Sequence, residues 1–216
     1  MAERHDIDRR RTASRQHAAD IGACLVHCHR RRFSDIRLRP TVPIFAENAS
    51  IACSDPGLRL RPAVDTDGPF LRHLFKASRA EGFAAAQLPA AALDALLDQQ
   101  FRVQTASYAL QFPGSSSFLI EWRQRAIGRL MLFCGCECWH VIDLMLLDAD
   151  RGQGIGTDVM QSVAVEAGSK GVGLLTLVVL EANQRARRFY TGLGFAGMGG
   201  PTESGHLVMI KQLGPH

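Results

Sequence analysis

A glycine-rich loop between an apolar strand and a helix constrains this chain more than any other feature. Residues 139–147 form a long apolar run that predicts a strand, and residues 154–168 repeat apolar side chains at helical spacing. Between them lies Arg151-Gly-Gln-Gly-Ile-Gly156. Glycines let a backbone approach a ligand closely, and the first turn of a helix presents unpaired N–H groups with a partial positive charge. The sequence therefore predicts a phosphate-binding site at the start of this helix.

The spacing of the glycines excludes two common phosphate-binding motifs. A P-loop for nucleoside triphosphates has Lys followed by Ser or Thr directly after its last glycine, but here Gly156 precedes Thr157 and Asp158. The dinucleotide fingerprint is G-x-G-x-x-G, whereas Gly152, Gly154 and Gly156 are spaced G-x-G-x-G. The pattern that remains is R-x-x-G-x-G.

The rest of the chain predicts a sheet with helices packed against it. Period-two or continuous apolar runs predict further strands at residues 58–62, 117–122, 127–133, 174–180 and 206–213. Helical spacing, Pro89 and possible cap residues predict further helices after residues 65–67, after residue 89 and over 183–193. This alternation is typical of an α/β or α+β fold.

Positive charge is concentrated in the first quarter of the chain. The whole sequence has a net charge of +4, and residues 1–57 contain ten Arg against seven acidic residues. Because this segment lacks sustained periodicity, we expect residues 1–57 to be an Arg-rich, disordered extension and residues 58–216 to be the folded domain. Arg clusters can also bind nucleic acid or anionic lipid, so a nucleic-acid-binding arm is the alternative interpretation of this extension.

Several features predict a cytoplasmic protein without a membrane partner. No stretch approaches the roughly 18 uninterrupted apolar residues of a membrane span. The first eight residues lack the apolar core of a secretory signal. Six cysteines in 216 residues do not describe a disulfide framework, which indicates free thiols in a reducing compartment.

Two motifs together resemble the GNAT superfamily of N-acetyltransferases, over about residues 58–213. The loop at residues 151–156 is similar to the family's loop for the pyrophosphate of CoA, and residues 181–195 resemble its last helix. The resemblance implies a mixed, mostly antiparallel sheet that is splayed between its fourth and fifth strands, with helices on both faces. It also implies acetyl-CoA as the co-substrate.

The resemblance further implies which residues contact acetyl-CoA. Backbone N–H groups near Leu146 and Leu147 would hold the thioester carbonyl, and Asn183 would contact the CoA arm or cap its own helix. The loop contributes the rest of the predicted contacts, namely Arg151, Gly152, Gln153, Gly154, Ile155, Gly156 and Thr157.

Catalytic roles also follow from the resemblance. Tyr190 matches a tyrosine that protonates the leaving thiolate in many members, although it can equally be an inward-packed helix residue. His140 aligns with the position of a general base, and an imidazole can accept a proton near neutral pH. Strict alternation places His140 on the face of Leu146 and Asp143, the alternative base, on the opposite face; a bulge would reverse either assignment. A relayed water is a third option.

A zinc site is the alternative interpretation of the alternating residues Cys134, Cys136, Cys138 and His140. Consecutive residues on one strand face are about 6–7 Å apart, which is too far for ligands of one ion. A hairpin turn expected at Gly135 would scatter them further, so we expect no metal site.

The sequence thus predicts an N-acyltransferase that moves an acetyl group directly from acetyl-CoA to an amine of a small molecule or peptide. The alternative is a non-catalytic, CoA-binding regulatory module on the same fold. Family resemblance adds that homodimers are common, and the acceptor cannot be identified from these residues because specificity depends on variable loops.

Overall fold

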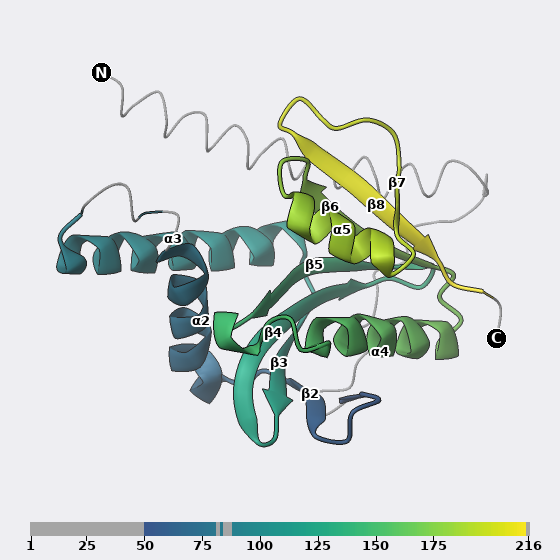
Figure 1. Cartoon of the computed structure of the whole chain (residues 1–216), viewed down its shortest axis with the longest axis horizontal. Helices are drawn as coiled ribbons and strands as arrows, with labels where there is room; N and C mark the ends of the chain where they lie inside the picture. The colour runs from purple at the N-terminus through teal and green to yellow at the C-terminus, as the bar shows by residue number, and fades with distance from the viewer. Residues whose placement is uncertain (1–49, 81–82, 84–87, 215–216) are drawn as a thin grey trace. The chain divides into compact units, whose positions relative to one another are not determined.

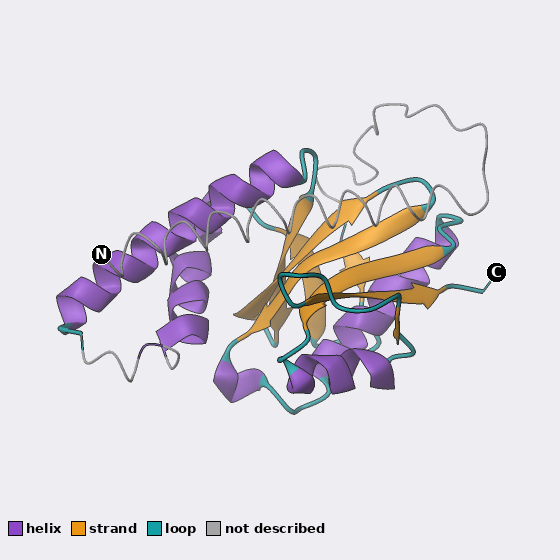
Figure 2. Ribbon diagram, turned by 90° about the horizontal axis from the view of Figure 1, so that it is seen from above, coloured by secondary structure: helices purple, strands orange, loops and turns teal. Residues whose placement is uncertain are grey.

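The computed structural model, shown from two sides in Figures 1 and 2, describes residues 50–80, 83 and 88–214. These residues form two compact units. The larger unit comprises residues 50–175 and 213–214, and the smaller unit is Thr176–Gln212. Residues 1–49, most of the expected extension, lie outside the described residues.

The strands of the larger unit lie side by side in chain order, and each neighbouring pair is antiparallel. Their bounds are β1 Ile51–Ala52, β2 Leu58–Pro62, β3 Ser116–Trp122, β4 Arg125–Cys134 and β5 Cys138–Leu146. At the β3–β4 turn, Arg123 and Gln124 have φ values of 50° and 64°. That left-handed conformation suits a two-residue hairpin, whose twist matches the twist of its strands. The strands predicted in this part of the chain are confirmed.

The fold begins earlier than the predicted boundary after residue 57. Ile51 is buried in β1 and pairs with Leu60 of β2. The following connection is also held, because the Asp158 carboxylate accepts hydrogen bonds from the N–H groups of Ser54 and Asp55 at 2.9 and 2.8 Å. This short strand leaves no signal in the sequence, because two residues are too few to show a period.

Helices of the larger unit are η1 Asp65–Asp67, α2 Gly68–Ala80, α3 Ala90–Gln111, η3 Asp148–Asp150 and α4 Ile155–Ser169. α2 contacts α3, β4 and β5, while α4 contacts β1 and β5. Pro89 is the N-cap of α3 rather than its first helical residue. Between α2 and α3, the Lys76 ammonium lies 2.7 Å from a carboxylate oxygen of Asp94 and of Asp98.

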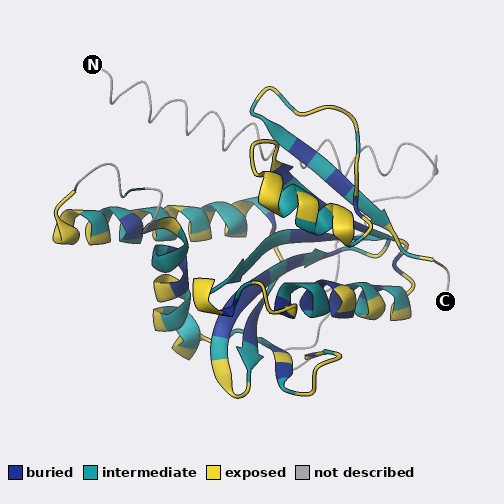
Figure 3. Ribbon diagram, in the orientation of Figure 1, coloured by how far each residue is buried: buried dark blue, intermediate teal, exposed yellow. Residues whose placement is uncertain are grey.

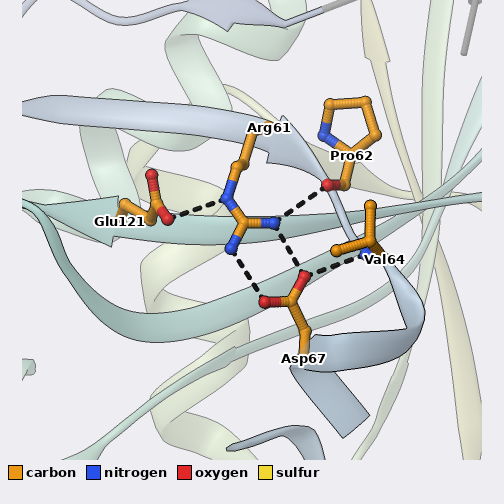
Figure 4. A network of polar contacts seen from close by, with 5 residues as sticks. All are labelled: Arg61, Pro62, Val64, Asp67 and Glu121. Atoms are coloured by element: carbon orange, nitrogen blue, oxygen red, sulfur yellow. Dashed lines mark hydrogen bonds and ion pairs between the residues drawn. The ribbon is translucent and has the colours of Figure 1, made fainter. Parts of the chain in front are cut away.

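An arginine network fixes the point where the chain leaves the sheet for α2 (Figure 4). Arg61 on β2 donates to the Glu121 carboxylate of β3 at 2.7 Å and to both Asp67 oxygens at 2.7 and 2.8 Å. Asp67 also accepts from the Val64 N–H at 2.9 Å. The Arg61 hydrogen bonds outweigh burial and hold the pKa of Asp67 below its usual range. One guanidinium therefore joins two strands to the start of the helix.

A bulge in β5 determines which side chains share a face of the β4–β5 hairpin. Met131 pairs with Asp143, but the next residue, Leu132, pairs with Val141, so Ile142 has no counterpart on β4. An extra residue reverses the alternation of side chains along its strand. Strict alternation would place His140, before Ile142, and Asp143, after it, on opposite sides of β5. Because of the bulge they face the same side.

The two resulting faces differ in composition. What we call the apolar face consists of Leu130, Leu132, Cys134, Trp139, Val141, Leu144 and Leu146. Its most buried members, Leu130, Leu132, Trp139 and Val141, are at most 3% exposed. What we call the polar face consists of Arg129, Met131, Phe133, His140, Asp143 and Met145. α2 and α3 cover the polar face, since Ser78 Oγ lies 3.6 Å from Met145 Sδ and the Phe112 ring stacks on His140.

α4 contacts β1 and β5. The positive charge of Lys170, the C-cap of α4, acts on the thiol of Cys134, which lies on the apolar face. The buried stripe of α4 consists of Ile155, Val159, Met160, Ser162, Val163 and Ala167. Figure 3 shows the burial pattern, in which the strands carry most of the buried positions and α4 has both buried and exposed residues.

The smaller unit contains β6, which starts at the end of the larger unit, and then α5, β7 and β8. Their bounds are β6 Leu174–Leu180, α5 Gln184–Gly192, β7 Ala196–Gly197 and β8 His206–Gln212, with the strand order β6-β8-β7. The predicted fold class, a mixed α/β fold of mostly antiparallel strands with helices, is confirmed. The splay between the fourth and fifth predicted strands stays a prediction. No helix among the described residues combines the length and hydropathy needed to cross a bilayer.

Candidate functional site

The predicted strand–loop–helix is present at residues 144–157. β5 ends at Leu146, and α4 begins at Ile155 after Gly152 and Gly154, whose φ values are 76° and 81°. Gly154 is the N-cap of α4 and supplies no side chain to the unpaired N–H groups of the first turn. A Cβ placed on Gly154 would meet no atom of the described residues within 4 Å. The helix terminus is therefore open on this side and suited to an anion.

Two polar side chains of the loop bind the loop itself. Arg151 donates from Nε to the Leu146 carbonyl at 3.0 Å and forms an ion pair with Asp148 at 2.5 Å. Gln153 donates to the Ala149 carbonyl at 3.0 Å. These bonds tie the loop to the end of β5 and so limit its freedom before any ligand arrives. Their predicted contacts with CoA stay predictions.

A buried carboxylate, which was not predicted from the sequence, anchors the turn before the loop. Asp150 is only 2% exposed and receives both arms of the Arg125 guanidinium, at 3.1 and 2.5 Å. Arg125 opens β4, so this bidentate pair connects the start of that strand to the turn before α4. A planar guanidinium fixes a carboxylate in both position and orientation.

The acidic residue in the first turn of α4 does not occupy the open helix terminus. Asp158 instead accepts hydrogen bonds from Ser54 and Asp55 N–H groups, and from Ser162 Oγ at 3.2 Å. Burial alone would raise its pKa, but these hydrogen bonds outweigh burial and hold the pKa of Asp158 below its usual range. Its carboxylate is committed to the β1–β2 connection.

At the end of β5, the N–H groups of Leu146 and Leu147, both predicted to hold the thioester carbonyl, differ in their hydrogen bonding. The Leu147 N–H donates to the Ile127 carbonyl at 2.9 Å and is thus engaged by β4. In an antiparallel ladder, N–H groups of successive residues point to opposite edges, so the Leu146 N–H is directed away from β4. Leu146 is therefore the better suited of the two.

The bulge at Ile142 places both base candidates on the polar face. His140 pairs with Phe133 and Asp143 pairs with Met131. Strict alternation would have put His140 on the face of Leu146, and the structure shows instead that Leu146 belongs to the opposite face. The structure thus brings the two candidate bases to the same side of the sheet.

His140 and Asp143 nevertheless have different surroundings. His140 is 3% exposed, and its ring lies 5.4 Å from the Phe112 ring at an interplanar angle of 16°. Asp143 forms an ion pair with Arg129 of β4. Burial and, secondly, the negative charge of Asp143 raise the pKa of Tyr108 on α3 well above its usual range. Neither Arg129 nor Tyr108 was predicted from the sequence to belong to the site.

Asn183 and Tyr190 belong to the smaller unit. Asn183 Oδ1 accepts a hydrogen bond from the Ala186 N–H at 3.1 Å, which confirms the helix-capping role considered for it. Tyr190 is half-buried, with its ring 5.0 Å from Phe189 and 5.7 Å from Phe195. The role of Tyr190 in proton transfer stays a prediction.

The four alternating soft ligands of the β4–β5 hairpin do not converge. The Gly135 N–H donates to the Cys138 carbonyl at 3.1 Å across the expected turn. Cys134 pairs with Trp139 on the apolar face, whereas His140 lies on the polar face. Within the described part of the chain, no group of three or more His, Cys, Asp or Glu side chains is placed to hold a metal ion.

Comparisons with known proteins agree on one family. Residues 78–195 match the model of the acetyltransferase (GNAT) family. Among solved structures, an acetyltransferase from Thermus thermophilus shares 24% identity over 72% of this chain and 97% of its own, with a TM-score of 0.55.

Two further structures are similar at lower identity. The PaiA N-acetyltransferase of Thermoplasma acidophilum, solved in complex with coenzyme A, is 15% identical over 72% of this chain and 98% of its own, with a TM-score of 0.56. An acetyltransferase from Salmonella typhimurium that modifies the N-terminal serine of ribosomal protein L7/L12 is 14% identical, over 77% of this chain and all of its own, with a TM-score of 0.58. At these identities the likeness shows the fold.

Proposed function

This chain belongs to the GNAT acetyltransferase family, and from that premise we propose that it transfers an acetyl group from acetyl-CoA directly to the nitrogen of an amine. The observation that carries the proposal is the open N-terminus of α4. It is entered through Gly152 and Gly154 in the left-handed conformation and is left uncapped by any side chain. Backbone N–H groups and the helix dipole at such a terminus favour a pyrophosphate.

The proposed reaction makes three chemical demands. The amine nitrogen attacks the thioester carbonyl carbon, the carbon–sulfur bond breaks, and CoA leaves as a thiolate. The nitrogen must lose a proton, the carbonyl oxygen must be stabilised as negative charge develops, and the thiolate must gain a proton.

Residues of the chain suit each demand. The Leu146 N–H, directed away from β4, is the proposed donor to the carbonyl oxygen. Tyr190 is the proposed proton donor to the thiolate. His140 or Asp143 on the polar face is the proposed acceptor of the amine proton, and Asn183 together with residues 151–157 is proposed to bind CoA.

The second candidate function is a CoA-binding module without catalysis. One observation favours it: both base candidates already have close partners, since His140 is buried against Phe112 and Asp143 is paired with Arg129. A chain of this kind would bind CoA through the α4 terminus and release no thiol.

Thiol release from acetyl-CoA separates the two functions. The protein is incubated with acetyl-CoA and a panel of amines, and free CoA is followed with a thiol reagent. The panel includes peptides with free N-termini beside small amines, because one structure of similar fold modifies an N-terminal serine. Amine-dependent thiol release supports the transferase, and CoA binding without turnover on any amine supports the module.

The Tyr190→Phe variant tests the proposed proton donor. Removing a general acid should lower turnover by about 10²-fold or more, while the affinity for CoA stays within about twofold of the wild type. Phe189→Leu, at the neighbouring position of α5, is the matched control for packing and should keep most of the turnover. Equal turnover of Tyr190→Phe and the wild type would remove Tyr190 from the chemistry.

A further inference from the structure

An ion pair on the polar face carries an inference about how the acceptor is held. Arg129 lies in the middle of β4, inside an otherwise apolar run from Ile127 to Phe133. Its guanidinium pairs with the Asp143 carboxylate, one residue beyond the bulge in β5. A charge placed on a buried strand face is costly unless it is paired, and replacing such a pair by apolar side chains is often neutral or stabilising. Stability alone therefore does not explain the pair.

The two partners are not equally buried. The Arg129 side chain is 6% exposed, whereas the Asp143 side chain is 18% exposed. Arg129 Nε also has no hydrogen-bond partner among the described residues. The guanidinium thus lies at the enclosed end of the pair, and the carboxylate is the end that a solute can approach.

The groups around Asp143 define what it can bind. The charges of Asp143, of Arg129 and of Arg79 on α2 all influence the pKa of Tyr108 on α3. His140 lies on the same face as Asp143, and their partners on β4, Phe133 and Met131, are two residues apart. Asp143 is the acidic residue among these groups, and 18% of its side chain is exposed, so its carboxylate can accept a hydrogen bond from an N–H-donating ligand.

We propose that the Asp143 carboxylate binds the amine group of the acceptor and that Arg129 is a positioning residue, which fixes this carboxylate from the enclosed side. The inference rests on the proposed acetyl transfer, since it assigns the amine end of that reaction to the polar face. It also accounts for the bulge at Ile142, because the bulge turns Asp143 to the side of Arg129. The acceptor class is then an amine that is protonated near neutral pH.

The test compares charged and charge-free versions of the pair. The variants are Asp143→Asn, Arg129→Lys and the double variant Arg129→Met/Asp143→Leu, which replaces the pair by apolar side chains. The matched control is Lys76→Met/Asp98→Leu, which removes an ion pair of the same unit on the α2–α3 contact. Probes are phenethylamine and 1,5-diaminopentane, each beside the alcohol in which hydroxyl replaces the amine.

The first measurement is ligand binding by thermal shift, which needs no turnover. The amines, and not the alcohols, should raise the melting temperature of the wild type and of the Lys76→Met/Asp98→Leu control. The charge-free double variant should melt within a few degrees of the wild type but lose the amine-dependent shift. Asp143→Asn should also lose it, which keeps the test valid if the double variant does not fold.

The second measurement is steady-state kinetics with the best amine of the panel. Arg129→Lys should raise the KM for the amine by about tenfold or more, the effect of weakening a hydrogen bond between charged groups, while the affinity for CoA stays unchanged. A merely structural arginine would lower the melting temperature without this selective change in KM.

The outcomes separate this inference from the proposed function. Amine-dependent shifts that survive in the double variant, or their absence from the wild type, would overturn the role of Asp143. Thiol release that depends on amine and is unaffected in Asp143→Asn would overturn it and leave acetyl transfer standing. Selective amine binding through Asp143 without thiol release would support this inference and contradict acetyl transfer.

Discussion

The two faces of the β4–β5 hairpin are formed by the same two strands but differ in composition and in burial. The apolar face has no charged side chain: Leu130, Leu132, Trp139 and Val141 are at most 3% exposed, and the two leucines at the end of β5 are half-buried. The polar face mixes Arg129, His140 and Asp143 with half-buried apolar side chains. One face is what a sheet needs in order to fold, and the other carries groups that cost stability to keep there.

The difference between the faces depends on one residue. If Ile142 were a regular strand residue paired with β4, strict alternation would place His140 and Asp143 on opposite sides of β5. With the bulge, both lie on the polar face while Trp139 and Val141 stay on the apolar face. Bulges often occur beside active sites because they redirect a side chain without changing the rest of the sheet.

The largest expected effect is on the apolar face. Trp139→Ala removes a side chain with no exposed surface and should cost about 3–5 kcal/mol in free energy of unfolding. The matched substitution Phe133→Ala, on the half-buried polar face, should cost less than half as much. Urea denaturation of both variants measures the difference. Equal losses would mean that the two faces do not differ in their contribution to the core.

A smaller effect is expected where the hairpin approaches the candidate site. A Cβ on Gly128 would lie 2.3 Å from the Met145 carbonyl oxygen and 2.7 Å from Leu146 Cδ2. Gly128→Ala should therefore push the end of β5 away from β4, at a cost of about 1–3 kcal/mol, and weaken turnover through the Leu146 N–H. Gly173→Ala has open space around it and is the control. Wild-type stability and turnover for Gly128→Ala would contradict this close approach.

The smallest effect concerns a thiol of the apolar face. Burial raises the pKa of Cys134 to about 12. Below the ordinary thiol pKa both folded and unfolded chains keep the proton, so the contribution of this thiol to stability is intact. As the pH rises from about 9 toward 12, the unfolded chain ionises first and stability falls. Cys134→Val should flatten this alkaline decline in the melting temperature, and an unchanged pH profile would contradict the burial of the thiol.

Much of the fold was predictable from periodicity and glycine placement. The apolar runs indicated the strands, and Gly194, with a φ of 86°, follows the end of α5 at a position where glycine is common. The loop before α4 was also predictable, because a glycine pattern between an apolar run and a helical run depends only on local sequence. β1 was not, because its two residues depend on pairing with β2.

The polar face was only partly predictable, for a physical reason. His140 and Asp143 were recognised by residue type and position, but the face of each depends on strand register, which a bulge alters without a clear local signal. Arg129 was missed, although an arginine within the apolar run from Ile127 to Phe133 was a usable sign. Its partner lies 14 residues away and is brought near only by the β4–β5 pairing.

The central claim is that the N-terminus of α4 binds the pyrophosphate of CoA, and CoA affinity in two matched glycine variants tests it most directly. Gly154→Glu puts a carboxylate at the start of α4, and Gly171→Glu puts one beyond its end. Both glycines have positive φ, 81° and 75°, and open space around them, so the backbone strain is similar.

Titration calorimetry with CoA should show that affinity falls by at least about tenfold in Gly154→Glu, since about 1.4 kcal/mol of repulsion is sufficient for that. Gly171→Glu should bind within about twofold of the wild type. A folded Gly154→Glu protein that binds CoA as tightly as Gly171→Glu would contradict the assignment of this helix terminus.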